Sequence, residues 1–252
     1  MSDDGGDTRL HTRWVLWYHG NKNNNWTNDS YAILDVATTV PDVRHIRTIF
    51  EERSEVSARM TDGSAMLFWM RERPTGDGCK RFVYPMWEDP HNQTGGALCA
   101  TGSRCELASV FWSLVAHVSG ETLVREDAEA AFAVEPLLNG VSFVAKPNNS
   151  AIVKVWYAAL PDDAPKPTRL RRQCQSSLLA STLLRDWTPA ARNLVVNMNC
   201  YVVRHTNVKH KDCIDTSERM RRDHFKQRRL ETRERRKRHR GRGKGRQARR
   251  SH

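Results

Sequence analysis

The chain has 252 residues, and its 41 Lys and Arg against 29 Asp and Glu give a formal net charge of +12. Its apolar runs fall far short of the roughly 20 residues of a membrane span, which excludes a membrane-spanning protein. The first thirty residues carry acids and glycines where a signal peptide needs a basic patch and an apolar stretch, so we expect no secretory signal. The six cysteines are then typical of reduced thiols in the cytosol or nucleus.

The positive charge is concentrated at one end of the chain. Residues 204–252 contain 20 Lys and Arg against 6 Asp and Glu, a net charge of +14, whereas residues 1–203 carry −2. We predict a disordered acidic segment at residues 1–8, one domain at 9–203, and a basic tail at 204–252 that is largely disordered or a single helix. A tail of this charge is expected to bind RNA. Its basic residues 235–240 also fit a nuclear import signal.

The first half of the domain predicts strands, a helix and a hairpin. The apolar, aromatic run Arg13–Tyr18 is typical of a strand, and Trp26 ends the polar loop that follows. Apolar residues then recur at helical spacing from Val40 to Phe50. A strand, a turn-rich hairpin loop and a returning strand follow at residues 64–71, 74–80 and 81–86.

The second half begins with a well-marked helix over residues 104–119. Ser103 and Glu106 form a capping box, one apolar stripe runs along the segment, and Gly120 ends it. Two strands, a helix and a last strand follow at residues 141–146, 151–158, 168–186 and 194–203. Strands interrupted by three well-spaced helices predict an antiparallel α+β domain with the helices on one face of the sheet.

Signatures of catalysis and metal binding are weak. The sequence lacks the Gly-x4-Gly-Lys-Ser/Thr, His-Glu-x-x-His and Gly-x-Ser-x-Gly motifs. Cys200, His205, His210 and Cys213 have a loosely zinc-like order, but metal sites usually show tighter paired spacing, so we interpret them as thiols and surface histidines. We expect no catalytic residue, no metal and no cofactor; a hydrolase is the least supported alternative.

Trp87 and Glu88 are the most informative residues of the domain. They lie at the end of a predicted strand and before the pair Gly95–Gly96. An indole face attracts a cation, and a neighbouring carboxylate accepts two hydrogen bonds and adds an opposite charge. The two residues therefore suit a planar cationic base such as N7-methylated guanine. A core Trp beside a solvated acid fits them too, and the chemistry alone leaves that alternative open.

Four aromatic segments occur in a distinctive order. Residues 13–18 read Arg-Trp-Val-Leu-Trp-Tyr, Trp26 follows a polar loop, residues 85–89 read Pro-Met-Trp-Glu-Asp, and Trp156 follows Val155 on a late strand. In this order residues 9–203 resemble the eukaryotic translation initiation factor 4E family, which binds the 7-methylguanosine cap of messenger RNA. The resemblance implies a strongly curved antiparallel sheet, backed by three helices on its convex face and binding the cap on its concave face.

The resemblance also implies roles for single residues. Trp26 and Trp87 would stack on the two faces of the methylated base, Glu88 would bind its Watson–Crick edge, and Trp156 would approach the N7 methyl group. The other five tryptophans are then expected to pack in the core: Trp14, Trp17, Trp69, Trp112 and Trp187.

The basic residues that hold the cap phosphates in this family are sparse here. Ala97 stands where an Arg is expected after Gly-Gly, and the loop at residues 146–150 offers only Lys146. Lys154 has the same strand parity as Trp156 and is the second candidate phosphate contact, although a solvated strand lysine fits it equally. We expect a thin phosphate clamp, which the basic tail would partly replace.

In members of the family, the convex face that carries the helices, called the dorsal face, binds partner proteins. A Trp on the first helix there contacts the Tyr-x4-Leu helix of scaffold factor 4G and of inhibitory binding proteins. Arg44 occupies that position here, while Leu10 and Val40 keep their apolar matches. Loss of a buried aromatic anchor weakens an interface strongly. We therefore expect weak or altered scaffold binding.

We interpret the chain as a binding module, not an enzyme. It would bind capped mRNA in translation initiation or its regulation, with a dorsal partner other than ordinary factor 4G and no membrane. Two alternatives stay open: a general RNA-binding or ribonucleoprotein scaffold with weakened cap binding, and a repressor that competes for caps. The expected location is the cytoplasm, and the tail leaves a nuclear share open.

Overall fold

The computed structural model describes residues 8–20, 23, 25–52, 63, 65–75, 78–125, 138–146, 148–160 and 179–205. The chain divides into two compact units, Met1–Thr206 and Asn207–His252, and every described residue belongs to the first unit. The expectations for residues 1–7 and for the tail beyond residue 205 therefore lie outside the described residues.

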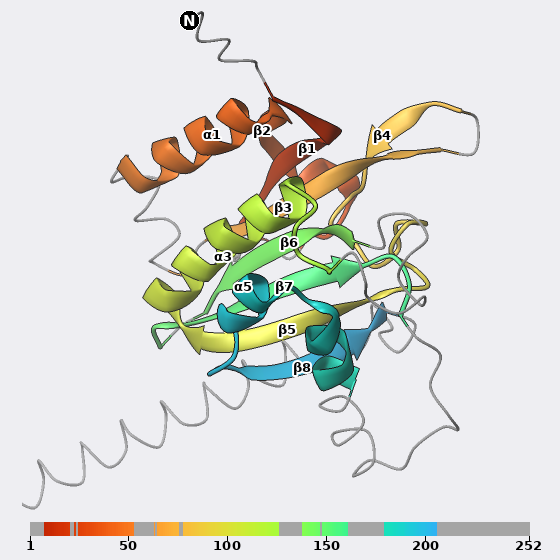
Figure 1. The fold of residues 1–252 in the computed structure, drawn as a ribbon. Helices are drawn as coiled ribbons and strands as arrows, with labels where there is room; N and C mark the ends of the chain where they lie inside the picture. Colours follow the sequence, from red (N-terminus) through yellow and green to blue (C-terminus); the bar gives the residue numbers. More distant parts are fainter. Residues whose placement is uncertain are drawn as a thin grey trace, which may run out of the picture. The chain divides into compact units, whose positions relative to one another are not determined.

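An eight-stranded antiparallel sheet is the frame of the described chain (Figure 1). Seven strands follow the order β2-β1-β3-β6-β7-β5-β8, and β4 pairs with β3. Their bounds are β1 Arg9–Gly20, β2 Ala32–Thr39, β3 Ala65–Pro74, β4 Lys80–Phe82, β5 Gly96–Ser103, β6 Leu138–Ala145, β7 Ser150–Tyr157 and β8 Asn199–Arg204. The predicted α+β class with an antiparallel sheet is confirmed.

Helix α3 begins where its capping box predicts, whereas α5 was not predicted. The bounds are α1 Val40–Glu52, α3 Arg104–Ser119 and α5 Pro189–Asn193, with a 3-10 turn η1 at Asn28–Ser30. Residues 179–186 are also helical and form the described part of the helix predicted at 168–186. Ser103 Oγ accepts a hydrogen bond from Glu106 N (3.4 Å) at the start of α3, as the capping box requires.

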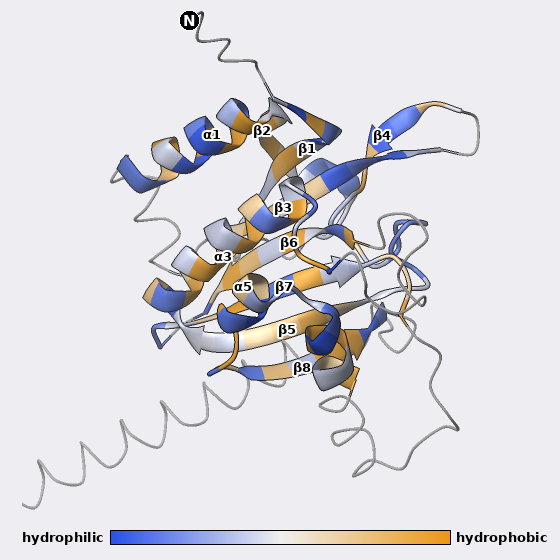
Figure 2. Cartoon of the chain, viewed as in Figure 1, coloured by the Kyte–Doolittle hydropathy of each residue, from blue (hydrophilic) through white to orange (hydrophobic). Residues whose placement is uncertain are grey.

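Strand alternation divides the buried residues into two clusters. A helix-side core combines Leu16, Leu67 and Trp69 of the strands with the buried faces of α1 and α3, which lie on the same side of the sheet in Figure 1. Both helices alternate hydrophilic with hydrophobic residues in Figure 2, as expected of helices with one buried face.

The second cluster, which we call the open-face cluster, contains no residue of a described helix. It comprises Val15, Trp17, Tyr31, Met66, Phe68, Met70, Val83, Val144 and Trp156, bordered by Trp26, Val36, Phe82, Tyr84, Met86 and Trp87. Its strand residues alternate with those of the helix-side core, so it lies on the face of the sheet opposite α1 and α3.

The five tryptophans predicted to pack in the core are between 0% and 5% exposed, which confirms their packing role: Trp14, Trp17, Trp69, Trp112 and Trp187. Two indoles also find polar partners, because Trp69 Nε1 donates to Ser119 Oγ and Trp187 Nε1 donates to Tyr157 Oη. A buried indole N–H usually needs such an acceptor.

Strands β1 and β3 are longer than predicted, whereas two other strands are shorter. The strand predicted to return as far as Met86 ends at Phe82, where side chains replace a neighbouring strand as hydrogen-bond partners. The last strand was predicted from Leu194 but begins at Asn199, because Val195 N and Met198 N donate to carbonyls three residues back and form turns. The apolar run there covers a helix end and a turn as well as the strand.

The described cysteines are free thiols, as predicted: Cys79, Cys99, Cys105 and Cys200. None of the helices in the described part of the chain combines the length and apolar character of a membrane span.

Candidate functional site

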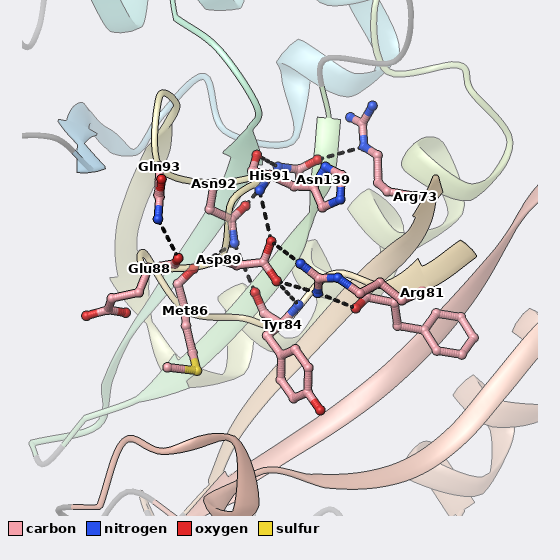
Figure 3. A network of polar contacts seen from close by, with 11 residues as sticks. Arg73, Arg81, Tyr84, Met86, Glu88, Asp89, His91, Asn92, Gln93 and Asn139 are labelled. Carbon is pink, nitrogen blue, oxygen red and sulfur yellow. Dashed lines mark hydrogen bonds and ion pairs between the residues drawn. The ribbon is translucent and has the colours of Figure 1, made fainter. Parts of the chain in front are cut away.

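The segment that carries Trp87 and Glu88 is a loop between β4 and β5 that is organised by Asp89 (Figure 3). The carboxylate of Asp89 accepts hydrogen bonds from Arg81 Nη1 (2.7 Å) and Nη2 (3.1 Å), and from the backbone N–H groups of Tyr84 (3.0 Å) and His91 (2.9 Å). Four donors satisfy a carboxylate whose side chain is only 2% exposed. The loop therefore keeps its shape without pairing to a strand.

Two asparagines connect this loop to the sheet. Asn92 Nδ2 donates to the carbonyls of Tyr84 (2.9 Å) and Met86 (2.8 Å). Asn139 of β6 donates in turn to Asn92 Oδ1 (2.8 Å) and accepts a hydrogen bond from Arg73 Nε of β3 (2.9 Å), as Figure 3 shows. The backbone on both sides of Trp87 is thus fixed to β3 and β6.

The loop returns to the sheet through Gly95 and Gly96. A Cβ on Gly95 would lie 1.8 Å from the carbonyl oxygen of Tyr157, and one on Gly96 would lie 2.5 Å from that of Val203. No larger residue fits against the backbone at this distance. The Gly-Gly pair therefore serves close packing of the loop against β7 and β8.

His205, just after β8, completes the closure of the loop. Its backbone N–H donates to the Gly95 carbonyl (3.0 Å) and its Nδ1 to the Asn92 carbonyl (2.7 Å). Burial lowers the pKa of His205 to about 4 and the charge of Lys154 adds to this, against the opposing hydrogen bond to Asn92. The imidazole is therefore neutral at pH 7.

The expectation that His205 is a surface histidine is wrong, since it is 4% exposed. The fold covers it because its backbone N–H and its imidazole both bind the loop between β4 and β5. The described residues contain no group of three or more His, Cys, Asp or Glu that could hold a metal. His210 and Cys213 lie outside the described residues.

Trp26 is half-buried and lies just before η1. The ring of His19, at the end of β1, stacks on it with 4.4 Å between centroids and 8° between planes. His19 Nε2 also contacts the carbonyl of Asn25 (2.9 Å), the residue before Trp26. The end of β1 therefore positions the first tryptophan of the site.

A continuous row of ring contacts connects Trp26 with Trp87 across the open face. Its neighbouring centroids lie between 4.4 Å and 6.4 Å apart. We call this set the aromatic row; in order it is Trp26, His19, Tyr31, Phe68, Trp156, His205 and Trp87. Such spacings are those of interacting aromatic pairs.

Tyr31 is the residue of the aromatic row that contacts the loop between β4 and β5, which carries Glu88. Its hydroxyl lies 3.4 Å from the Pro85 carbonyl oxygen, which it can reach as a donor. Burial raises the pKa of Tyr31 well above its usual value, and the nearby charge of Glu88 adds to the shift. The exposed carboxylate of Glu88 therefore lies near the aromatic row, as a binding role requires.

Trp156 lies inside the row and is 2% exposed. Its Nε1 donates to Ser142 Oγ (2.9 Å), so the polar edge of the indole is already satisfied within the protein. The Nζ of Lys154 lies 5.8 Å from the ring centroid of Trp87 and 6.0 Å from that of Trp156. These distances suit cation–π contacts.

Lys146 is half-buried at the end of β6. Burial lowers its pKa, and the charge of Lys154 lowers it further. The two candidate phosphate contacts are therefore close enough to repel each other. Ala97, opposite Trp156 on β5, is buried and adds no charge.

The three predicted dorsal residues lie on the helix side of the sheet. Leu10 on β1 is half-buried against the helix-side core, and Val40 begins α1 with its N–H bonded to the Thr8 carbonyl (3.0 Å). Arg44 is exposed on α1. The structure places them on the opposite side of the sheet from the aromatic row.

The structure thus places Lys154 beside both Trp87 and Trp156. Trp26 lies at the other end of the aromatic row, and the charge of Glu88 acts on Tyr31 within the row. Sequence reasoning missed His19, Asn92 and Asn139, and misjudged His205. No local signal identifies them, because the contact between His205 and Asn92 spans 113 residues of sequence.

Comparison with models of known protein families identifies the family to which the chain is similar. The family model described as eukaryotic initiation factor 4E matches residues 9–186. Among curated proteins compared by sequence, none matches the chain significantly.

Three solved structures illustrate the likeness of the fold. A schistosome eIF4E in complex with m7GpppA and 4E-BP has a TM-score of 0.53 at 13% identity, over 81% of this chain and 93% of that one. Ascaris suum eIF4E-3 in complex with the m7G cap has a TM-score of 0.52 at 18% identity, over 80% and 93%. Caenorhabditis elegans eIF4E-3 with the 4E-binding protein Mextli and a cap analog has a TM-score of 0.50 at 14% identity, over 79% and 94%.

The open sheet with its helices on one face agrees with the fold of these structures, and the family model covers well over half of the chain. The chain therefore belongs to the eukaryotic initiation factor 4E family.

Proposed function

We propose that the chain binds the 7-methylguanosine cap of messenger RNA in translation initiation or its regulation, with the base between Trp26 and Trp87. The observation that carries the proposal is the aromatic row, whose two end indoles are half-buried while the indoles elsewhere in the chain are buried. Membership of the family and the cap ligands named for the similar structures support it.

The chemistry of the site suits a methylated base. Stacking contributes about 1–3 kcal/mol per base, and the positive charge of N7-methylguanine adds a cation–π term to each indole. The exposed carboxylate of Glu88 can accept the two N–H donors of the Watson–Crick edge. Trp156, covered by its neighbours, would line the site rather than stack on the base.

Lys154 and Lys146 are the proposed phosphate contacts. Their mutual repulsion would be relieved by a polyanion, since each added negative charge favours both ammonium groups. We expect Lys154→Ala to weaken binding of 7-methyl-GTP several-fold while leaving that of the 7-methylguanosine nucleoside nearly unchanged. Equal losses for both ligands would assign Lys154 to the base instead.

Retention on immobilised 7-methyl-GTP, with elution by free 7-methyl-GTP but not GTP, tests the proposal. Trp26→Ala, Trp87→Ala and Glu88→Gln should each lower the affinity at least about tenfold, as expected for the loss of a stacking or charged contact. Glu52→Gln, at the exposed end of α1, is the matched control and should bind normally. Retention that ignores all three site substitutions would contradict the proposal.

The expected partners follow from the two faces of the molecule and from the tail. The dorsal residues Leu10, Val40 and Arg44 would bind a regulatory protein, and 4E-binding proteins accompany two of the similar structures. The basic tail would add salt-sensitive affinity for RNA. The family is a non-catalytic one, and we extend that property and a cytoplasmic location, with a nuclear share, to this chain.

The second candidate function is a general RNA-binding or ribonucleoprotein scaffold with weakened cap binding. The buried Ala97 favours it, because an alanine at this position offers no positive charge to the phosphates. Binding of uncapped RNA that equals that of capped RNA would select this alternative.

A further inference from the structure

A buried histidine lies against each of the two tryptophans at the ends of the aromatic row. His19 stacks on Trp26 with 4.4 Å between centroids and 8° between planes. His205 stacks on Trp87 with 6.1 Å and 22°. Both histidines are almost fully buried. Each indole therefore has one ring face packed against a buried imidazole.

Each histidine also binds the loop that carries its tryptophan. The ring of His19 contacts the carbonyl of Asn25 through Nε2 (2.9 Å), and the ring of His205 contacts that of Asn92 through Nδ1 (2.7 Å). A carbonyl oxygen can only accept, so these nitrogens carry the hydrogen. One imidazole therefore does two things at each end of the row: it stacks on the indole and it anchors the backbone beside it.

The remaining ring nitrogens, His19 Nδ1 and His205 Nε2, are buried and have no hydrogen-bond partner among the described residues. A buried polar atom without a partner costs free energy. A phenylalanine would fill the same space without that cost, so packing alone does not account for an imidazole. What the imidazole adds at both places is the N–H donor to the loop.

We propose that His19 and His205 are positioning residues that pre-organise Trp26 and Trp87 for the cap. The inference rests on the proposed function. A loop and an indole that are ordered before binding need not be ordered by the ligand, and this raises affinity without a new contact. His205 is neutral at pH 7, so it supports Trp87 without repelling a cationic base.

Matched substitutions separate the two contributions of each ring. His19→Phe and His205→Phe keep a flat ring and remove the donor. His19→Gln and His205→Asn keep a donor near the position of the bonding nitrogen, Nε2 or Nδ1, and remove the ring. His45, exposed on α1 on the other side of the sheet, supplies the controls His45→Phe and His45→Gln.

The affinity of the full chain for 7-methyl-GTP, measured by calorimetry, is the first readout. Each of the four variants should bind about 2- to 10-fold more weakly, the range for loss of one aromatic pair or one hydrogen bond. The urea unfolding midpoint of each variant, measured beside its affinity, separates a loss of fold from a loss of positioning, since only a loss of fold lowers the midpoint strongly. The inference is overturned if 7-methyl-GTP affinity is unchanged in all four variants, or falls equally in the His45 controls.

Acrylamide quenching without ligand is the second readout. Six of the eight tryptophans are buried, so a change in quenching reports mainly on Trp26 and Trp87. His19→Gln and His205→Asn should make more fluorescence accessible to acrylamide than in the wild-type chain, and unchanged quenching in both would also overturn the inference. If one substitution unfolds the chain, the inference is tested with the other substitution at the same position and with the variants of the other histidine.

The two readouts separate the inference from the proposed function. If the wild-type chain does not bind 7-methyl-GTP, the proposed function fails. Acrylamide quenching then still decides whether the histidines position the indoles.

Discussion

At the scale of single residues, the protonation of His205, which binds the loop carrying Trp87, makes the free energy of unfolding depend on pH. Burial and the charge of Lys154 lower its pKa from 6.5 to about 4, while the hydrogen bond to Asn92 opposes the shift. The unfolded chain therefore binds this proton more readily than the folded chain. The free energy of unfolding receives its full contribution above about pH 6.5 and loses it as the pH falls toward about 4.

Urea unfolding of the wild-type chain and of His205→Asn at pH 7 and pH 4.5 measures this contribution. Other titrating groups act alike in both chains, so the wild type should lose about 2 kcal/mol more than the variant between the two pH values. Equal losses in both chains would show that His205 titrates normally in the folded state.

At the scale of elements, the loop between β4 and β5 depends on one buried carboxylate. Asp89 is paired with Arg81 at 2.7 Å, with side chains 2% and 33% exposed, whereas the Arg47–Glu51 pair of α1 has the same distance with both side chains largely exposed. Asp89 is the buried partner and also accepts hydrogen bonds from two backbone N–H groups, so its removal leaves several donors without their carboxylate. An exposed pair contributes little.

Asp89→Asn should therefore lower the free energy of unfolding by about 3 kcal/mol, and Glu51→Gln by less than about 0.5 kcal/mol. Denaturant titration of both variants at pH 7 measures the difference. Similar small losses in the two variants would mean that the loop is held by Asn92 and Asn139 without Asp89.

The exposed face of helix α1 allows a prediction about the binding of a partner peptide. Arg44 is exposed on α1, and its assignment to the position of the family's aromatic anchor is a prediction from the sequence. Arg44→Trp should raise the affinity for a Tyr-x4-Leu peptide about tenfold or more, because aromatic anchors dominate such interfaces. His45→Trp, the next residue on the same helix, is the control. No gain in Arg44→Trp over this control would contradict the assignment of the dorsal position.

At the scale of the whole molecule, the charge distribution predicts two modes of RNA binding. Residues 204–252 carry +14 and residues 1–203 carry −2, so we expect sequence-blind attraction to phosphates to come from the tail. The affinity of the full chain for uncapped RNA should fall steeply and linearly on a logarithmic salt scale, whereas that for 7-methyl-GTP should fall only slightly. Filter binding with uncapped RNA and calorimetry with 7-methyl-GTP, each between low and moderate salt, measure the two salt dependences. Equal slopes for the two ligands would contradict the assignment of sequence-blind binding to the tail.

Much of the fold could be predicted from sequence because local signals agree with it. Ser103, Glu106 and Gly120 mark α3, and the Pro74–Lys80 segment closes the β3–β4 hairpin. Strands β2 and β5 were not predicted as separate elements. Strand β2 lies at the sheet edge with several exposed residues, and β5 is built from small residues, so neither shows a clear apolar pattern.

The candidate site could be predicted only where its chemistry is local. Trp87 and Glu88 are adjacent in sequence and stand out by residue type. The support for these residues is not local: Asn139 binds Asn92 across 47 residues and His205 binds it across 113. The number of such pairings in a chain is too large for residue type alone to select them, so tertiary structure is needed to find them.

The most direct test of cap binding is intrinsic tryptophan fluorescence of the full chain, titrated with 7-methyl-GTP and separately with GTP. Trp26 and Trp87 are the half-buried indoles among eight, so ligand stacking should quench their emission while the buried six change little. We expect strong quenching by 7-methyl-GTP, weak quenching by GTP, and loss of the difference in Trp87→Ala. Equal responses to the two ligands, unaffected by that substitution, would contradict it.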